Sequence, residues 1–414
     1  MNASRRRVRV TEGSAQVSPL EQSERDLPLK VMMRRLFWSM GYSAALNVKL
    51  RAYISGDVRG PGFQEYTDLD VLGIGFSPMG KPHLSIADCK TTRSRAIERV
   101  FWVKGVAAFF KADDAFLVRS NPVPAATRTL SARLGVGVLD SDDYKRLAQT
   151  FPSGPDLDGP LRCLFDMPSV RLQNEVSGLD RKLNPLADFM RFDYWLYEPH
   201  RNLTQSVAHL GDASSLLDPK HPRHLSLFFE MAWLYAFALA RAIHHIRSSW
   251  ISEVPIAVQT YIAGGELALR EKHSLVELLA RAGMEIDSGV ISPPYASMLI
   301  ELLTRILVRP AETGEILRYA EYLTMASLVG ETATVGSAFG TAHVRPIAAK
   351  LLADICGFLV TATGLNPEFR AAAREKLVLD LTGGGRPQTK AVHTAGSEAA
   401  VDAGADGRGK PESQ

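Results

Sequence analysis

The first 150 residues alternate between helical and strand-like hydrophobic patterns. The segment "PLKVMMRRLFWSM" (28–40) repeats apolar residues at helical spacing, and Gly41 ends it. Three strand-like segments follow, namely "AALNVKLRAYI" (44–54), "TDLDVLGIGF" (67–76) and "HLSIADCK" (83–90). Because only the short turn "SPMGKP" separates the last two, they are predicted to pair as a β-hairpin.

The alternation continues through the rest of this region. The segment "RAIERVFWVKGVAAFFK" (95–111) predicts a helix, and its apolar stripe consists of Ile97, Val100, Phe101, Val103, Val106, Ala107 and Phe110. The segments "DDAFLVRS", "AATRTLSARLG", "VGVLDS" and "DDYKRLAQT" then predict a strand, a helix, a strand and a helix. Residues 28–150 therefore carry the order α-β-β-β-α-β-α-β-α, which is typical of an α/β domain.

The pattern changes after this region. The segment "FPSGPDLDGP" (151–160) is rich in Pro, Gly and Asp and predicts a linker. Residues 161–381 show long helical periodicity, as in "HLSLFFEMAWLYAFALARAIHHI" (224–246), and predict a mostly helical second domain of unknown role. The small, polar tail 382–414 is expected to be disordered, and residues 1–27 to form a flexible basic arm.

Length and composition are those of a globular chain. With 414 residues and 46% hydrophobic content, two or more domains are expected, since single cores stop growing at roughly 250 residues. The longest apolar stretch carries Glu230 and Arg241, so no membrane segment is predicted. The basic N-terminus lacks the apolar segment of a secretory signal. Cys89, Cys163 and Cys356 are widely separated and form no Cys-x-x-Cys pair, which favours a reducing cytoplasm.

Charge is distributed unevenly although the net charge is only +3. Between Lys90 and Arg133 there are nine basic and three acidic residues, a surplus of 9 − 3 = +6. Such a surplus can attract a polyanion, usually nucleic acid, but it is also found on ordinary solvated helices.

The tripeptide Asp-x-Lys occurs four times in the chain and means little by itself. Only the copy Asp88-Cys89-Lys90 ends an apolar strand. Residues two apart in a strand point to the same face, so Asp88 and Lys90 project together, and so do Asp68 and Asp70 on the preceding strand.

Pairing of these two strands would bring Asp70 and Asp88 within reach of one divalent cation. Two carboxylates in a partly buried sheet need a compensating charge, and hard oxygen ligands favour Mg²⁺ or Mn²⁺. The alternative is purely structural. In it, Asp68 and Asp70 cap a turn, and Asp88 and Lys90 form an exposed ion pair at a strand end.

The arrangement resembles the PD-(D/E)XK nuclease superfamily, particularly Mrr-type restriction endonucleases and archaeal Holliday-junction resolvases. The resemblance covers about residues 28–145, with "DLDVLG", "IADCK" and "AFLVRS" in the expected order. It implies a restriction-endonuclease-like fold, with a mixed central sheet flanked by helices. It also implies that Asp70, Asp88 and the main-chain carbonyl of Cys89 hold the metal and that Lys90 is the catalytic lysine.

Two features depart from the pattern of this superfamily. The position most often filled by Glu is Asp88 here, which has a shorter reach. Many Mrr-type members carry an acid inside the first helix, and "KVMMRRLFW" offers none. The substitutes are Glu24 and Asp26, just upstream, and Glu65 and Asp68, so the number of metal ions stays open.

The helix 95–111 is expected to face the substrate groove. Lys104 and Lys111 lie seven residues apart on one face, and Arg93 and Arg95 sit at its entry, where they can hold phosphates without reading sequence. The aromatic cluster "RFDYWLYEPHRN" (191–202) could bind bases or a partner, although such clusters more often belong to a core.

The sequence therefore predicts a Mg²⁺-dependent DNA endonuclease that hydrolyses phosphodiester bonds, in phage defence or DNA repair. Cutting both strands needs two such sites, so a homodimer is a further expectation, as is a protein partner of the helical domain. The alternative is a non-catalytic nuclease-like module that binds nucleic acid or scaffolds a complex. A third possibility is a helical sensor for which the nuclease-like part is only a support.

Overall fold

The computed structural model describes residues 19–54, 62–92, 96–151, 154–175, 180–249, 253–284 and 292–377. Arg93 and Arg95, which the sequence predicts as phosphate ligands, lie outside these ranges. The tail predicted for residues 382–414 lies outside them as well.

The N-terminal part of the chain forms five strands and four helices in the predicted order. Its elements are α1 (Pro19–Ser39), β1 (Ser43–Ile54), β2 (Gly62–Phe76), β3 (Pro82–Lys90), α2 (Ala96–Phe110), β4 (Asp114–Arg119), α3 (Ala125–Leu134), β5 (Gly137–Leu139) and α4 (Ser141–Ala148). The hydrophobic periodicity therefore predicted the order of the elements correctly.

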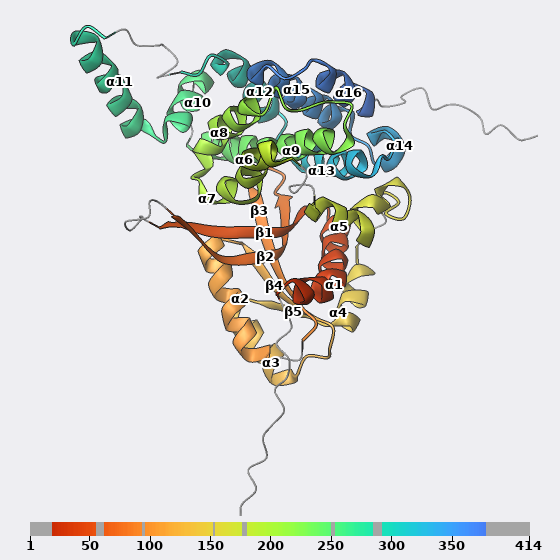
Figure 1. Cartoon of the computed structure of the whole chain (residues 1–414). Helices are drawn as coiled ribbons and strands as arrows, with labels where there is room; N and C mark the ends of the chain where they lie inside the picture. The colour runs from red at the N-terminus through yellow and green to blue at the C-terminus, as the bar shows by residue number, and fades with distance from the viewer. Residues whose placement is uncertain are drawn as a thin grey trace, which may run out of the picture. The chain divides into compact units, whose positions relative to one another are not determined.

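The sheet is mixed and its strands lie in sequence order, β1-β2-β3-β4-β5. β2 pairs antiparallel with β1 on one side and with β3 on the other. The short turn between β2 and β3 requires this direction for the second pair. β3, β4 and β5 are parallel, because helices α2 and α3 supply the crossover connections. Figure 1 shows α2 and α3 together on one side of the sheet and α1 and α4 on the other.

Helix α1 begins at Pro19, nine residues earlier than predicted, so residues 19–27 are not part of a flexible arm. The sequence favoured a start at Pro28, because proline is tolerated best at a helix start. Here Asp26 and Leu27 are buried against the rest of the protein, and these tertiary contacts hold the first turns of the helix.

The apolar stripe of α2 also differs from the prediction. Val100, Val103 and Val106 are buried as expected, but Ile97 and Phe101 are 47% and 55% exposed. The helix is apolar on more than one face, so periodicity alone did not show which face packs on the sheet.

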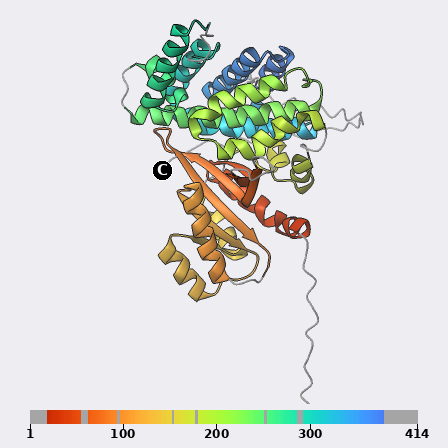
Figure 2. The ribbon, with the colours of Figure 1, turned by 60° about the vertical axis from the view of Figure 1, so that its left-hand side comes forward.

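The remainder of the described chain is mostly helical, as predicted. Its α-helices are α5 (Met167–Glu175), α6 (Asn184–Asp188), α7 (Tyr194–Leu196), α8 (Pro199–Asp212), α9 (Pro222–Ser248), α10 (Val254–Ala263), α11 (Glu266–Arg281), α12 (Ala296–Leu307), α13 (Thr313–Val329), α14 (Val335–Phe339), α15 (Pro346–Thr363) and α16 (Glu368–Lys376). A π-helical turn, η4 (Phe189–Asp193), joins α6 to α7. Helices α9 and α13 pack side by side at the centre of this part (Figure 2).

Helices α9 and α15 are long and apolar enough to cross a membrane by length and composition. The most apolar window of α9 is 89% buried inside the protein, and that of α15 is 56% buried. A core helix of a globular protein has the same properties, so these two helices are weak evidence for a membrane span.

A buried carboxylate joins the helical part to the α/β part. Glu321 of α13 accepts hydrogen bonds from Arg34 Nη2 (2.7 Å), Trp38 Nε1 (3.0 Å), Ser43 Oγ (2.6 Å) and the Ala44 N–H (2.9 Å). Turn η4 and helices α7 and α13 also pack on β1, the edge strand, and cover that edge of the sheet. The described residues up to Leu377 belong to one compact unit.

Candidate functional site

Asp70 and Asp88 lie opposite each other on neighbouring strands. Val71 of β2 pairs with Ala87 of β3, so the next pair along the antiparallel ladder is Asp70 with Asp88, on one face of the sheet. Both carboxylates are buried, with 3% and 6% of the residue exposed. The two strands therefore pair as predicted and place the two acids on one face of the sheet.

Lys90 lies at the centre of the acidic residues. Its Nζ atom is 3.1 Å from Asp70 Oδ2, 3.7 Å from Asp88 Oδ1 and 3.4 Å from Asp26 Oδ2. Cys89, between Asp88 and Lys90, buries its side chain and donates its backbone N–H to Asp70 Oδ2 at 2.8 Å. The Asp-x-Lys segment therefore contacts Asp70 through both its backbone and its lysine.

Asp26 of α1 is a third acid at this site. Its Oδ1 atom accepts hydrogen bonds from the Thr91 N–H at 2.8 Å and from Thr91 Oγ1 at 2.7 Å. Asp26 was one of four substitutes that the sequence offered for the missing helix acid. The early start of α1 brings it to the end of β3, where Lys90 and Thr91 lie.

Lys30 was not predicted as a site residue. It follows Asp26 by four residues, so both lie on one face of α1. Its Nζ atom is 2.8 Å from Asp70 Oδ1 and donates a 2.6 Å hydrogen bond to Asn47 Oδ1. The helical spacing from Asp26 could have indicated Lys30, but only with the correct start of α1.

Arg99 was also missed as a site residue. Its guanidinium binds Asp88 in bidentate fashion, with Nε 2.6 Å from Oδ2 and Nη2 on Oδ1, and it stacks on the Trp102 ring at 3.6 Å from the ring centre. Three carboxylates, those of Asp26, Asp70 and Asp88, thus contact three cations. The three cations are Lys30, Lys90 and Arg99. Among the described residues of the cluster, these charges balance.

The two central carboxylates have pKa values shifted in opposite directions. At Asp70, burial raises the pKa, but the positive charges of Lys30 and Lys90 outweigh burial and lower it. At Asp88, burial together with the charge of Asp70 outweighs Arg99 and raises the pKa. Burial lowers the pKa of Lys90, yet the charges of Asp70 and Asp88 outweigh it and raise that pKa.

The donor atoms suit Mg²⁺ in kind, since carboxylate oxygens are its preferred protein ligands. Lys30, Lys90 and Arg99 now hold these oxygens, so an ion that bound Asp70 and Asp88 would compete with these cations. Within the described residues, no group of three or more His, Cys, Asp and Glu side chains is placed to hold a metal ion.

Glu65 and Asp68, the other predicted substitutes, lie further along β2 and pair with Lys49. The Lys49 Nζ atom is 2.7 Å from Glu65 Oε1 and 3.9 Å from Asp68 Oδ2. Asp68 and Asp70 both line the cavity beside β1 and β2, and their spacing in the strand places them on one face.

Lys104 and Lys111 are exposed on α2 and just after it. Lys111 lines a second cavity of about 520 Å³ near Leu84, at the start of β3. Lys90 ends that strand, about 20 Å away at roughly 3.3 Å per residue. Lys111 is therefore not brought to the carboxylates.

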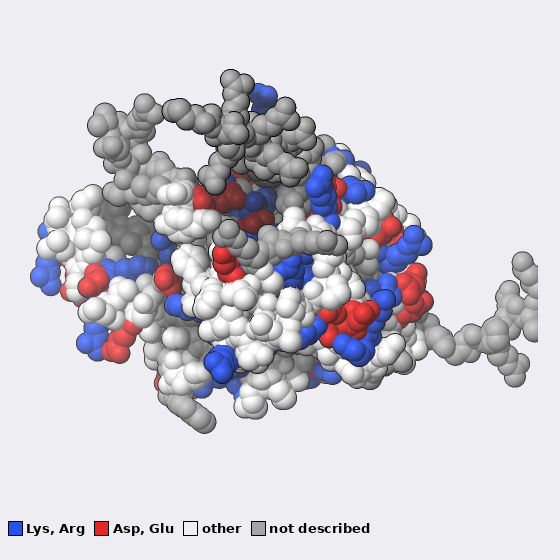
Figure 3. Space-filling model, turned by 90° about the horizontal axis from the view of Figure 1, so that it is seen from below, with Lys and Arg blue, Asp and Glu red and all other residues white. Residues whose placement is uncertain are grey.

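The local basic surplus does not form a continuous basic surface. Arg99 binds Asp88, and Arg128 binds Asp140 and Asp143 at 2.6 Å, all acids outside the segment that carries the surplus. Figure 3 shows Lys and Arg interspersed with Asp and Glu on the face seen from below. A count along the sequence could not include these partners.

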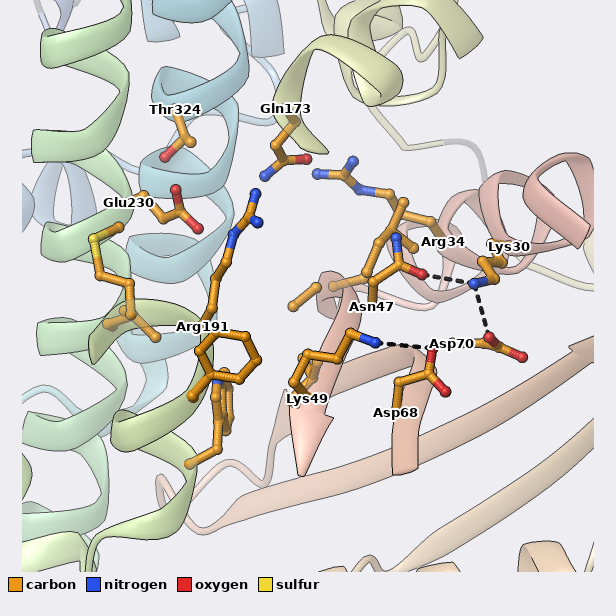
Figure 4. Close-up of a pocket in the computed structure, with 18 of the residues that line it drawn as sticks. Lys30, Arg34, Asn47, Lys49, Asp68, Asp70, Gln173, Arg191, Glu230 and Thr324 are labelled. Carbon is orange, nitrogen blue, oxygen red and sulfur yellow. Dashed lines mark hydrogen bonds and ion pairs between the residues drawn. The ribbon is translucent and has the colours of Figure 1, made fainter. Parts of the chain in front are cut away.

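A cavity of about 780 Å³ adjoins the carboxylate cluster. Lys30, Asp70 and Lys90 line one end, and side chains from η4, α7, α9 and α13 line the other. Figure 4 shows Glu230 and Arg191 across the cavity from Lys30 and Asp70.

The chain matches no protein-family model, and neither the curated proteins nor the solved structures that were searched gave a match. The resemblance to PD-(D/E)XK nucleases therefore rests on the residues and the geometry described above.

Proposed function

We propose that this protein is a Mg²⁺-dependent DNA endonuclease whose N-terminal part has the restriction-endonuclease-like fold. The observation that carries the proposal is the contact of Lys90 with the buried carboxylates of Asp70 and Asp88 at the open end of a β-hairpin. The order of the strands and helices supports it. A role in phage defence or DNA repair is part of the same proposal.

Each residue of the cluster has a role in this reaction. Asp70 and Asp88 would hold the ion. When bound, Mg²⁺ activates water and offsets negative charge on the phosphate. Lys90 orients the attacking water or stabilises charge on the phosphate, and Asp26 positions the ammonium group of Lys90.

Arg99 gives the cluster a means of opening. Its side chain is 28% exposed, whereas that of Asp88 is almost fully buried. A phosphate group that reaches this edge can bind the guanidinium of Arg99 in place of Asp88, because Arg binds phosphate as well as carboxylate. Asp88 is then released to bind a cation in place of Arg99.

A second candidate is a nucleic-acid-binding module without catalysis. The balance of three carboxylates against three cations among the described residues favours it, since such a cluster needs no metal ion to be stable. In this case Asp26, Asp88, Lys90 and Arg99 form a partly buried ion-pair network that holds α1 and α2 on the sheet.

The test is a cleavage assay with supercoiled, linear and single-stranded DNA and with RNA, in Mg²⁺ or in EDTA. Asp88→Ala and Lys90→Ala should each lower the cleavage rate in Mg²⁺ by about 100-fold or more, because each removes charge stabilisation of the reacting phosphate. The matched controls are Asp142→Ala and Lys145→Ala, which alter an exposed acid and lysine on α4 and should cleave normally.

Cleavage by the wild type that EDTA abolishes, together with inactive Asp88→Ala and Lys90→Ala, supports the nuclease. Binding of DNA without cleavage supports the non-catalytic module instead. Equal cleavage by the wild type and by both variants would remove the cluster from the mechanism.

A further inference from the structure

The cavity beside the carboxylate cluster is large enough for a nucleotide. Its volume of about 780 Å³ lies in the range of small-molecule sites, which is roughly 300–1,000 Å³. It runs from Lys30, Asp70 and Lys90 along β1 to helices α9 and α13. A ligand in it can therefore contact both the proposed reaction centre and the helical part.

Aromatic side chains form the wall contributed by the helical part. Phe192 of η4, Trp195 of α7 and Trp233 of α9 all line the cavity. Arg51 of β1 stacks on the Phe192 ring at 3.0 Å from its centre. The irregular turn η4 presents Phe192 and its neighbour Arg191 to the cavity, and π-helical turns are frequent at functional sites. Flat aromatic rings beside a polar site suit the faces of a nucleobase.

Glu230 is the least expected residue in this wall. It interrupts the apolar α9, and its carboxylate forms no hydrogen bond or ion pair with the residues that the structure describes. Burial raises the pKa of Glu230, against the opposing influence of Arg191. The charge of Arg191 offsets this burial only in part, so a further partner would stabilise the carboxylate, and its presence in the wall points to a ligand with N–H donors.

We propose that this cavity takes the base of one nucleotide of the nucleic-acid substrate, extruded from its stack. The base lies against Phe192 and Trp195, an exocyclic amino group donates to Glu230, and the sugar-phosphate points to Lys30 and Lys90. This inference rests on the proposed function, and it gives the helical part a role in choosing the substrate.

An extruded base loses its stacking and pairing, which costs a few kcal/mol, and contacts with the cavity must offset that free energy. Extrusion of a bulged or mismatched nucleotide costs less free energy, because its base is not normally paired. The cavity therefore predicts a preference for duplexes that carry an unpaired nucleotide with an amino-bearing base.

The test measures DNA binding in EDTA, so that it does not depend on cleavage. Fluorescence anisotropy compares duplexes with one bulged adenosine and with one bulged abasic residue. The wild type should bind the adenosine duplex about tenfold more tightly, since stacking of one base contributes roughly 1–3 kcal/mol. Glu230→Met should reduce this preference to about two-fold, and the matched control Glu271→Met, on the exposed face of α11, should retain it.

Thermal unfolding of the same variants separates binding from structure. Glu230→Met removes a partly buried acid that forms no hydrogen bond with the described residues and feels only the nearby charge of Arg191, so it should unfold at the same or a higher temperature than the wild type. Lower affinity with retained stability supports a ligand site, whereas strong destabilisation would show that Glu230 has a structural role and overturn the proposal.

The two proposals can fail separately. A preference for the bulged adenosine without any cleavage would keep the base pocket and reject the nuclease. Cleavage with equal affinity for the adenosine and abasic duplexes would reject the base pocket alone. Failure of the wild type to bind either duplex would overturn the base pocket.

Discussion

The side chains around Lys90 form a cluster whose charges already balance, and this balance determines how a metal ion can enter. Asp88 is the acid most open to exchange, because its main partner Arg99 reaches it from the exposed side. Asp70, by contrast, is held by Lys30, Lys90 and a backbone amide. Competition between Arg99 and a cation for Asp88 is therefore the step to test.

Arg99→Gln is expected to raise the affinity for a divalent cation by about tenfold, or roughly 1.4 kcal/mol. The substitution leaves Asp88 buried with less positive charge around it, and a cation then supplies what was removed. Titration calorimetry with Mn²⁺ measures the change. Arg146→Gln, which affects the exposed partner of Asp143, is the control and should leave affinity unchanged. Unchanged or weaker binding by Arg99→Gln would indicate a purely structural ion-pair network.

Asp70 and Asp88 contribute to stability with opposite dependence on pH. Because the pKa of Asp70 is lowered in the fold, its contribution is present above its unfolded pKa, about 3.9, and is lost as pH falls through its folded value. Because the pKa of Asp88 is raised, the folded state keeps that proton to higher pH. Its contribution therefore falls as pH rises from about 3.9 through the folded value.

Asp70→Asn is expected to lower the pKa of Asp88. The substitution removes a nearby negative charge and leaves Lys90 with fewer competing acids, and both changes favour the ionised form of Asp88. Carbon-13 NMR of the side-chain carboxyl groups, followed against pH, measures the shift. The pKa of Asp143, about 2 because of its hydrogen bonds to Asp140, Arg128 and Arg146, should stay constant. A rise in the pKa of Asp88 would contradict the electrostatic account.

Local periodicity predicted the elements of the α/β part well, because strand alternation and helical spacing are properties of neighbouring residues. Alternation also placed Asp70, Asp88 and Lys90 on one face correctly. The start of α1 was wrong, because buried contacts of Asp26 and Leu27 outweigh the preference of Pro28 for a first turn.

The remaining site residues come together only through long-range packing. Arg99 reaches Asp88 because α2 crosses back over the sheet, and Glu230 reaches the cavity from α9, far along the chain. The aromatic segment 191–202 was noted in the sequence as either core or base-binding. The structure divides it, since Tyr194 is buried and donates to the Leu234 carbonyl, whereas Phe192 and Trp195 line the cavity.

The contact between α1 and α13 depends on Glu321. Glu321→Gln is expected to lower the free energy of unfolding by about 3 kcal/mol, because Arg34 would remain buried without an opposite charge. Urea denaturation followed by circular dichroism measures this change. Glu301→Gln, which weakens an exposed pair with Arg305, should change the free energy by less than about 1 kcal/mol. Equal effects of the two substitutions would mean that the buried network contributes little.

At the scale of the whole molecule, the helical and α/β parts share one core. The helical part packs on β1, the edge strand of the sheet. Trp233 of α9 donates to Ser43 Oγ at 2.7 Å, and Glu321 of α13 accepts hydrogen bonds from Trp38 at the end of α1 and Ala44 at the start of β1. Neither part keeps these polar groups paired without the other. The same junction forms the wall of the cavity, so folding of the junction and substrate binding are linked.

The shared core predicts that residues 19–377 unfold in one cooperative transition. Far-ultraviolet circular dichroism reports mainly on the helical part. The fluorescence of Trp38, Trp102 and Trp233 reports on the α/β part and the junction once Trp195 and Trp250 are replaced by phenylalanine, which leaves the junction contacts of Trp38 and Trp233 intact. The two thermal curves should coincide, and the calorimetric and van't Hoff enthalpies should agree. Glu321→Gln should move both curves to lower temperature together, because each part depends on the junction. Two separate transitions, or a shift of only one curve, would show that the parts fold independently and that the cavity between them is not a fixed feature of the protein.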